Sequence, residues 1–277
     1  MNPATTRAAS GDRAAGAVRR PARPGIVAAI ARNTFREAVR DRVLYLLLFF
    51  ALGLILLSRV LSMITVGDET KILKDFGLSA IGLFGVLTAV LMGVGLVFRE
   101  IERRTVQVLL ARPIRRADFL LGKFAGLALV LAVNTGLMTL GLYALLALHG
   151  AADPGLLRGI GLLYIEQLVM TAAALLFSSF STPILSSLLT LGLYAVGHLS
   201  WSLLLLEEKL PPGAGRAVSH AFYWLLPNLD RLDIKAEVVH QVALAPSLVA
   251  LAAVYGAGWV LVLLAGACAV FARREFV

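Results

Sequence analysis

Charged residues and cysteine are both scarce in this chain of 277 residues. Only 16% of the residues are charged, whereas soluble domains carry about 25%, and 59% are hydrophobic. This composition excludes water as the main solvent, because a soluble core could not bury several separate apolar runs that are each long enough to cross a bilayer. Cys268 is the one cysteine, so an intrachain disulfide is excluded. Because it lies in an apolar run, a small core residue is the favoured interpretation.

The chain also lacks the motifs of several enzyme and metal-site classes. No G-x-x-x-x-G-K-[ST] phosphate loop occurs, because Gly122 and Lys123 are followed by Phe124. There is no G-x-S-x-G elbow and no pair of carboxylates within an apolar run, which counts against an intramembrane lipid-modifying enzyme. The methionines show no ligand spacing, and the histidines are scattered at His149, His198, His220 and His240. We therefore expect no metal, no cofactor and no ATP hydrolysis by this chain alone.

Six apolar runs are each long enough to cross a bilayer as a helix, which takes about 20 residues. They cover residues 43–64, 76–98, 119–148, 156–180, 183–206 and 247–271. We therefore expect an all-α, polytopic membrane protein with six transmembrane helices in one domain over 43–277. An even number of spans places both termini on the same side.

The formal net charge of +9 is distributed unevenly between the two sides of this arrangement. The segments on one side hold 18 basic and 7 acidic residues, and those on the other side hold 7 and 9. The first set is 1–42, 99–123 and 272–277, and the second set is 65–75, 149–158 and 207–246. Basic residues in short flanking segments stay on the cytoplasmic side, so both termini are predicted in the cytoplasm at the plasma membrane. The charge thus orients the protein, and a nucleic-acid partner loses its support.

The first 24 residues contain no apolar stretch of the length that a signal peptide needs. Residues 1–24 are rich in Ala and Arg, and we expect a disordered basic cytoplasmic tail. Residues 25–42 have apolar side chains at helical spacing, interrupted by charges, which predicts an amphipathic helix in the cytoplasmic interface. A plain anchor at the start of the first span is the alternative. The apolar positions are Val27, Ile30, Ala31, Phe35, Ala38 and Val39.

The longest segment predicted outside the membrane, 207–246, is too polar to cross it and too apolar to be free in water. Phe222, Tyr223 and Trp224 suit the membrane interface, where amphipathic rings are favoured. We expect a short helical hairpin that rests on the outer leaflet.

The cytoplasmic segment 99–118 is longer than a turn between two spans requires. Residues 100–111 can form a short helix that ends at Pro113, and Asp118 can cap the third span. Such a helix would present charged residues to the cytoplasm as a handle for a soluble partner. A solvated charged loop is the alternative on periodicity alone.

Three polar residues inside the apolar runs need a reason, because burying charge in a bilayer is costly. Glu166 lies near the middle of the fourth run, where a role in a pathway or in helix pairing competes with a protonated carboxyl bonded to backbone. Arg59 is close enough to the outer surface to snorkel. For His198, a hydrogen-bonded helix histidine is favoured over a ligand.

The cytoplasmic segment resembles the connection between the second and third helices of type-2 ABC transporter permeases. The resemblance rests on Glu102 to Thr105, followed by LLARP and then IRRADFLLGK. At the corresponding positions the family has acidic residues and Gly-Thr before a short coupling helix. Leu-Leu, Pro, a basic residue and Gly-Lys follow there. Arg104 stands where the glycine is usual. Residues 25–42 resemble the family's elbow helix, and LPNLDRLD at 226–233 is similar to the external segment of the subgroup associated with copper-enzyme maturation.

The resemblance implies the permease subunit of an ABC exporter, without its own nucleotide site. Its partners would be two cytoplasmic ATPase subunits, a second copy or a sister permease, and the lipid bilayer. His198 would then lie on the fifth helix, which lines the path together with the second. A proton-coupled carrier that uses Glu166 is the alternative. The residues that would contact the ATPase are Glu100, Glu102, Arg103, Arg104, Thr105, Arg115 and Arg116.

Overall fold

The computed structural model describes residues 23–64, 68–102, 116–199 and 226–273. In these ranges the chain is helical apart from turns, and it contains no strand, which confirms the all-α prediction. The elements in chain order are α1 (Arg23–Val39), α2 (Arg42–Ile64), α3 (Glu69–Glu102), α5 (Arg116–Leu148), α6 (Leu156–Ser178), α7 (Pro183–His198), the 3-10 turn η1 (Leu229–Leu232), α10 (Lys235–Val239) and α11 (Pro246–Arg273).

Five of these helices are long and apolar enough to cross a membrane. The spans are Arg42–Ser62, Glu69–Leu96, Ala117–Leu148, Leu156–Ser178 and Pro246–Ala272. They confirm a multi-pass membrane protein. Helix α7 is apolar but has only 16 residues, and most of the remainder of the run expected to end at 206 lies outside the described residues. The count of six spans therefore stays a prediction.

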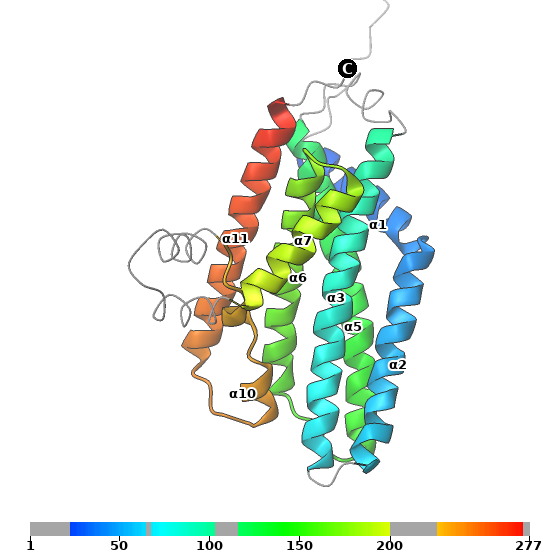
Figure 1. Ribbon diagram of the computed structural model, residues 1–277, viewed down its shortest axis with the longest axis vertical. Helices are drawn as coiled ribbons and strands as arrows, with labels where there is room; N and C mark the ends of the chain where they lie inside the picture. Colours follow the sequence, from blue (N-terminus) through cyan, green and yellow to red (C-terminus); the bar gives the residue numbers. More distant parts are fainter. Residues whose placement is uncertain (1–22, 65–67, 103–115, 200–225, 274–277) are drawn as a thin grey trace, which may run out of the picture.

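The long helices run side by side, and the bundle has two distinct ends (Figure 1). We call the end with α1 and the last residues of α11 the proximal end, and the end with α10 and the α5–α6 turn the distal end. Figure 1 places the start of α7 at the proximal end and its last turn beside η1, partway along the bundle. The first and last described helices thus share one end, as expected for termini on the same side.

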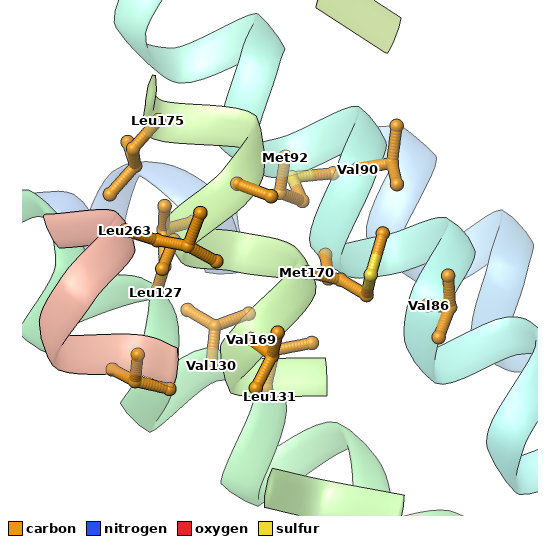
Figure 2. Close-up of a cluster of buried hydrophobic side chains, with 14 of the residues drawn as sticks. Val86, Val90, Met92, Leu127, Val130, Leu131, Val169, Met170, Leu175 and Leu263 are labelled. Carbon is orange, nitrogen blue, oxygen red and sulfur yellow. The ribbon is translucent and has the colours of Figure 1, made fainter. Parts of the chain in front are cut away.

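The core is built mainly from α3, α5, α6 and α11 (Figure 2). In the membrane-crossing windows of α3 and α6, 72% and 67% of the residues are buried, against 22% in α2 and 17% in α11. Helices α2, α3, α6 and α11 are all apolar enough to cross a membrane, so the difference in buried fraction distinguishes the central helices α3 and α6 from α2 and α11, which expose more of their surface to lipid. Phe49 on α2 and Leu251 on α11 are examples of large apolar side chains left exposed for lipid.

Helix α1 does not stand apart from the bundle but packs on the first half of α5. Two glycines of α5 allow the close approach: an ideal Cβ on Gly126 would lie 2.6 Å from the carbonyl oxygen of Ala31, and one on Gly122 would lie 2.6 Å from Ile30 Cβ. Ala31 and Thr34 are buried in this contact, whereas Arg32 and Arg36 of α1 are exposed. The segment is thus helical and amphipathic over 23–39, and its place in the interface remains a prediction.

Several predicted segments fall wholly or partly outside the described residues. They are the tail at 1–24, most of the segment 99–118, and residues 207–225 of the external segment. The rest of the external segment contains η1, which packs against α6, α7 and α11, and α10, which packs against α3 and α6. The predicted hairpin is therefore untested.

Candidate functional site

The side chain of Glu166 lies inside the bundle and meets a histidine from the neighbouring helix. Glu166 is ten residues after Leu156, the first residue of α6, and its side chain is 1% exposed. Its Oε1 atom lies 3.5 Å from Nε2 of His198, on the last residue of α7. The ring of Tyr194, one turn earlier on α7, lies 4.5 Å from the imidazole between ring centroids. The structure therefore brings two of the sequence-predicted residues together.

The segment that returns to the bundle after α7 adds an ion pair to this site. Asp233 Oδ2 lies 3.9 Å from His198 Nε2 and 3.0 Å from the ammonium of Lys235. We call Glu166, His198, Asp233 and Lys235 the polar cluster. Neither Asp233 nor Lys235 was singled out from the sequence, because both fall in a segment expected to rest on the membrane surface. The LPNLDRLD resemblance, which ends at Asp233, was the available signal.

One glycine and one tyrosine explain how irregular backbone can enter the bundle beside the polar cluster. An ideal Cβ on Gly197 would lie 2.7 Å from Leu229 Cγ, so α7 can receive the η1 turn only with glycine there. Leu229 and Leu232 are fully buried. The backbone N–H of Asn228 donates a 2.8 Å hydrogen bond to the Tyr255 hydroxyl. Unpaired backbone groups are not tolerated against lipid, so this side-chain acceptor helps the turn to lie within the bundle.

The charges of the polar cluster balance when the Glu166 and His198 pair holds one proton. Asp233 and Lys235 already form a neutral pair. Glu166 Oε1 and His198 Nε2 make no hydrogen bond with other described residues, and they face each other at 3.5 Å. A proton on either atom gives these two groups a donor and an acceptor, and it avoids the cost of a buried, uncompensated charge. The arrangement can thus hold a proton between the two side chains.

A second group of buried polar residues cross-links three core helices next to Glu166. The Thr135 hydroxyl of α5 donates to Gln167 Oε1 at 2.8 Å, and Gln167 Nε2 donates to the Ile81 carbonyl of α3 at 3.4 Å. Asn134 Nδ2 donates to the Thr88 hydroxyl at 3.2 Å. None of these residues stands out in the sequence, because each is uncharged within an apolar run. The available signal was the adjacent polar pair Asn134 and Thr135 in the third run, together with Gln167 next to Glu166 in the fourth.

Arg59 is not part of this site. Its guanidinium lies 3.8 Å from Glu69 of α3, and its side chain is 31% exposed. No interaction among the described residues links it to the polar cluster. Snorkelling toward the outer surface stays a prediction.

Asp153 ties four parts of the distal end together. Its carboxylate accepts the backbone N–H of Gly155 at 2.8 Å, pairs with the almost fully buried Lys74 ammonium at 3.2 Å, and accepts Gln241 Nε2 at 3.3 Å. Its backbone carbonyl accepts the Tyr143 hydroxyl at 2.7 Å. The Gly155 hydrogen bond, followed by Lys74, lowers the pKa of the Asp153 carboxyl below its usual value, against the opposing effect of burial. The segment after α10 is therefore held to α3, α5 and α6.

Asp41 performs a similar task at the proximal end. Its Oδ1 atom caps α2 by accepting the backbone N–H of Val43 at 3.0 Å, and its Oδ2 atom pairs with Arg99 of α3 at 2.6 Å. Burial raises the pKa of Asp41, but the Val43 and Arg99 interactions outweigh it, so the pKa lies below its usual value. Nearby, the buried Lys123 ammonium of α5 lies 3.7 Å from Glu37 of α1.

The residues predicted to contact an ATPase are not placed by the structure. Arg103, Arg104, Thr105 and Arg115 lie outside the described residues. Glu100, Glu102 and Arg116 belong to the ends of α3 and α5, and their side chains are not among those described. Their role stays a prediction. Within the described residues, no group of three or more His, Cys, Asp or Glu side chains could hold a metal ion.

The chain matches the model of a known protein family. The model of the family described as "ABC-2 family transporter protein" matches residues 28–276, which is nearly the whole chain. No curated protein matches the sequence.

Proposed function

The chain belongs to the ABC-2 transporter family and is a multi-pass membrane permease of an ABC transporter, and we propose that it is the path-forming subunit of an exporter driven by a separate ATPase. The observation that carries the proposal is the family match over 28–276 on an all-helical bundle with five candidate spans. Such permeases act with an ABC ATPase and are commonly dimers.

Coupling to the ATPase is proposed to run through the segment 99–118, whose charged residues would bind the ATPase from the cytoplasm. Two contacts support this route. Arg99, at the start of the segment, pairs with Asp41 at the α1–α2 junction. Gly122 and Gly126, just after the segment, pack against α1. A displacement of the segment would therefore act on α1, α2, α3 and α5 together.

The proximal end is proposed to face the cytoplasm, in the plasma membrane. The support is the excess of basic residues in the segments assigned to that side. Six spans are part of the proposal, with the fifth formed by α7 and the residues that follow it. The second subunit would be another copy of this chain or a sister permease.

The path is proposed to pass beside α3, α6 and α7, where polar groups are available inside an otherwise apolar bundle. Glu166 and His198 supply hydrogen-bonding groups at the end of α7. Intramembrane ionisable residues generally mark substrate or proton pathways. Membership of the subgroup associated with copper-enzyme maturation is also proposed, on the LPNLDRLD resemblance. In such a role this chain would serve the copper pathway without binding the metal itself.

The test of ATPase coupling is purification from the native membrane. We expect the chain to bring down an ATP-binding subunit, and charge reversal by Glu100→Lys with Glu102→Lys should weaken that association. Arg158→Glu, a reversal in the α5–α6 region at the other end of the bundle, is the matched control. Recovery of the chain alone, without stimulated ATPase activity, would refute the proposal.

A proton-coupled carrier is the second candidate function, and the Glu166 and His198 pair is the observation that favours it. A carrier of this kind would transport along a pH gradient after ATP is depleted, and Glu166→Gln would abolish that transport. An ABC permease would lose transport on ATP depletion and would be indifferent to the gradient. Transport into inside-out vesicles, with ATP and the pH gradient varied separately, distinguishes the two.

A further inference from the structure

An apolar pocket opens between the external segment and the first part of α11. It has a volume of about 330 Å³ and is lined mainly by aliphatic side chains. Ile234 lies after η1, and Leu248, Val249 and Ala252 belong to the first two turns of α11. The volume is at the small end of the range of about 300 to 1,000 Å³ for ligand pockets, so it suits one acyl chain better than a whole lipid.

The pocket opens toward the region that lipid must occupy. Helix α11 is one of the five candidate spans, and its membrane window is only 17% buried. Two of its leucines line the pocket and remain largely exposed, Leu248 at 57% and Leu251 at 67%. A pocket bordered by exposed aliphatic side chains of a membrane-spanning helix is accessible to acyl chains from the bilayer.

A cationic group completes the lining of the pocket. Arg231 of η1 is exposed, and its guanidinium carbon lies 5.3 Å from the centre of the Tyr255 ring, which holds it at the pocket. Within the described residues Arg231 forms no ion pair, although Asp230 precedes it in the chain, while the neighbouring Lys235 is paired with Asp233. A guanidinium in a membrane setting needs an anionic partner, and its planar fork matches a phosphate.

We propose that this pocket binds one acyl chain of an anionic phospholipid, with the phosphate on Arg231. The pocket supplies the apolar surface for the acyl chain, and Arg231 supplies the charge that complements the phosphate. The preference for an anionic over a zwitterionic lipid therefore comes from the contact with Arg231. The proposal goes beyond the function proposed above. It concerns binding by this chain alone and holds whether or not an ATPase subunit is attached.

Lipid binding to the purified full chain tests the proposal without any transport assay. The chain in detergent is offered an equal mixture of phosphatidylglycerol and phosphatidylcholine with identical acyl chains, and retained lipid is identified by native mass spectrometry. We expect phosphatidylglycerol to be retained in excess. Arg231→Gln should reduce that excess about tenfold, the effect of losing one charge-assisted contact. Arg231→Lys should restore part of it.

Two further variants separate this pocket from general surface effects. Arg158→Gln removes another exposed arginine, from α6, that does not line the pocket, and it should leave the excess unchanged. Ala252→Phe fills the pocket and should reduce retention of both lipids, with Ala252→Leu as a smaller change if the first variant fails to fold. Equal retention of the two lipids, insensitive to Arg231→Gln, would mean annular lipid only and would overturn the proposal. An equal loss in Arg158→Gln would overturn it as well.

Discussion

The carboxylate of Glu166 and the imidazole of His198 face each other at 3.5 Å inside the bundle, from the middle of α6 and the end of α7. Each is the nearest complement of the other, since neither Oε1 nor Nε2 has a hydrogen-bond partner elsewhere in the described part of the chain. The pair joins α6, one of the two most buried helices, to α7, which stops beside η1. Its integrity therefore bears on both packing and the proposed path.

Glu166→Ala should destabilise the protein by about 1 to 3 kcal/mol, because it leaves His198 buried without its partner and opens a cavity. Glu166→Gln should be close to the native protein, since its amide can donate to His198. Thermal unfolding of the purified protein in detergent measures both. Glu69→Gln, at a carboxylate whose side chain is 55% exposed, is the control and should have little effect. Equal midpoints for the Ala and Gln variants would contradict the proposed pairing.

The Asp153 interactions should make stability depend on pH. The pKa of Asp153 is lower in the folded state than its ordinary value of 3.8. Its contribution is therefore fully present above that ordinary value and is lost as the pH falls through the lower, folded-state pKa. Asp153→Asn removes the ionisable group and leaves the Lys74 ammonium buried without its carboxylate.

We expect the variant Asp153→Asn to unfold at lower temperature than the native protein at neutral pH. The difference between the two midpoints should shrink as the pH is lowered below about 4, because the native carboxyl then protonates as well. Thermal unfolding from pH 3 to pH 7 measures it. A difference that is independent of pH would assign the effect to hydrogen-bond geometry instead of charge.

The sequence predicted the parts of the fold that follow from the bilayer. Long apolar runs must form helices there, because every backbone group needs a partner within its own segment. The amphipathic spacing at 25–42 similarly anticipated a helix with exposed arginines. The close packing of α1 on α5 could not be foreseen, because Gly122 and Gly126 gain their meaning only from the helix that faces them.

Only two of the four residues of the polar cluster could be predicted from the sequence, because the other two depend on how distant segments pack together. A carboxylate in an apolar run is conspicuous in any sequence, so Glu166 and His198 were singled out. Asp233 and Lys235 belong to a polar segment where charges are ordinary. Only the insertion of η1 between helices, which depends on Gly197 and on the Tyr255 hydroxyl, brings Asp233 to His198 and Lys235 with it.

The Asp41 and Arg99 ion pair should matter for coupling more than for assembly. It joins the α1–α2 junction to the end of α3, next to the segment proposed to bind the ATPase. In Asp41→Asn we expect the ATPase subunit still to co-purify, because the proposed contact residues are intact. Its stimulation by the permease should fall several-fold. Arg40→Gln, at the neighbouring exposed arginine, is the control, and an equal fall in that variant would rule out a specific role for the pair.

Gly126 and Gly136 of α5 offer a matched test of how closely α1 must approach the bundle. A Cβ at Gly126 would lie 2.6 Å from both the Ala31 carbonyl oxygen and Thr34 Cβ, whereas a Cβ at Gly136 would meet nothing within 4 Å. Gly126→Ala should therefore cost about 1 to 3 kcal/mol, because α1 has to shift. Gly136→Ala should be neutral or stabilising, since alanine is the better helix former.

Thermal unfolding of both variants in the same detergent gives the comparison, and the accessibility of a cysteine introduced at Thr34 reports on the α1 contact itself. In the Gly126→Ala background that cysteine should react with a polar maleimide faster than in the Gly136→Ala background. The Cys268→Ala substitution in both backgrounds removes the native thiol. If the two alanine variants unfold together and label at the same rate, α1 does not depend on the glycine contact, and the link from the coupling segment to α1 loses its structural basis.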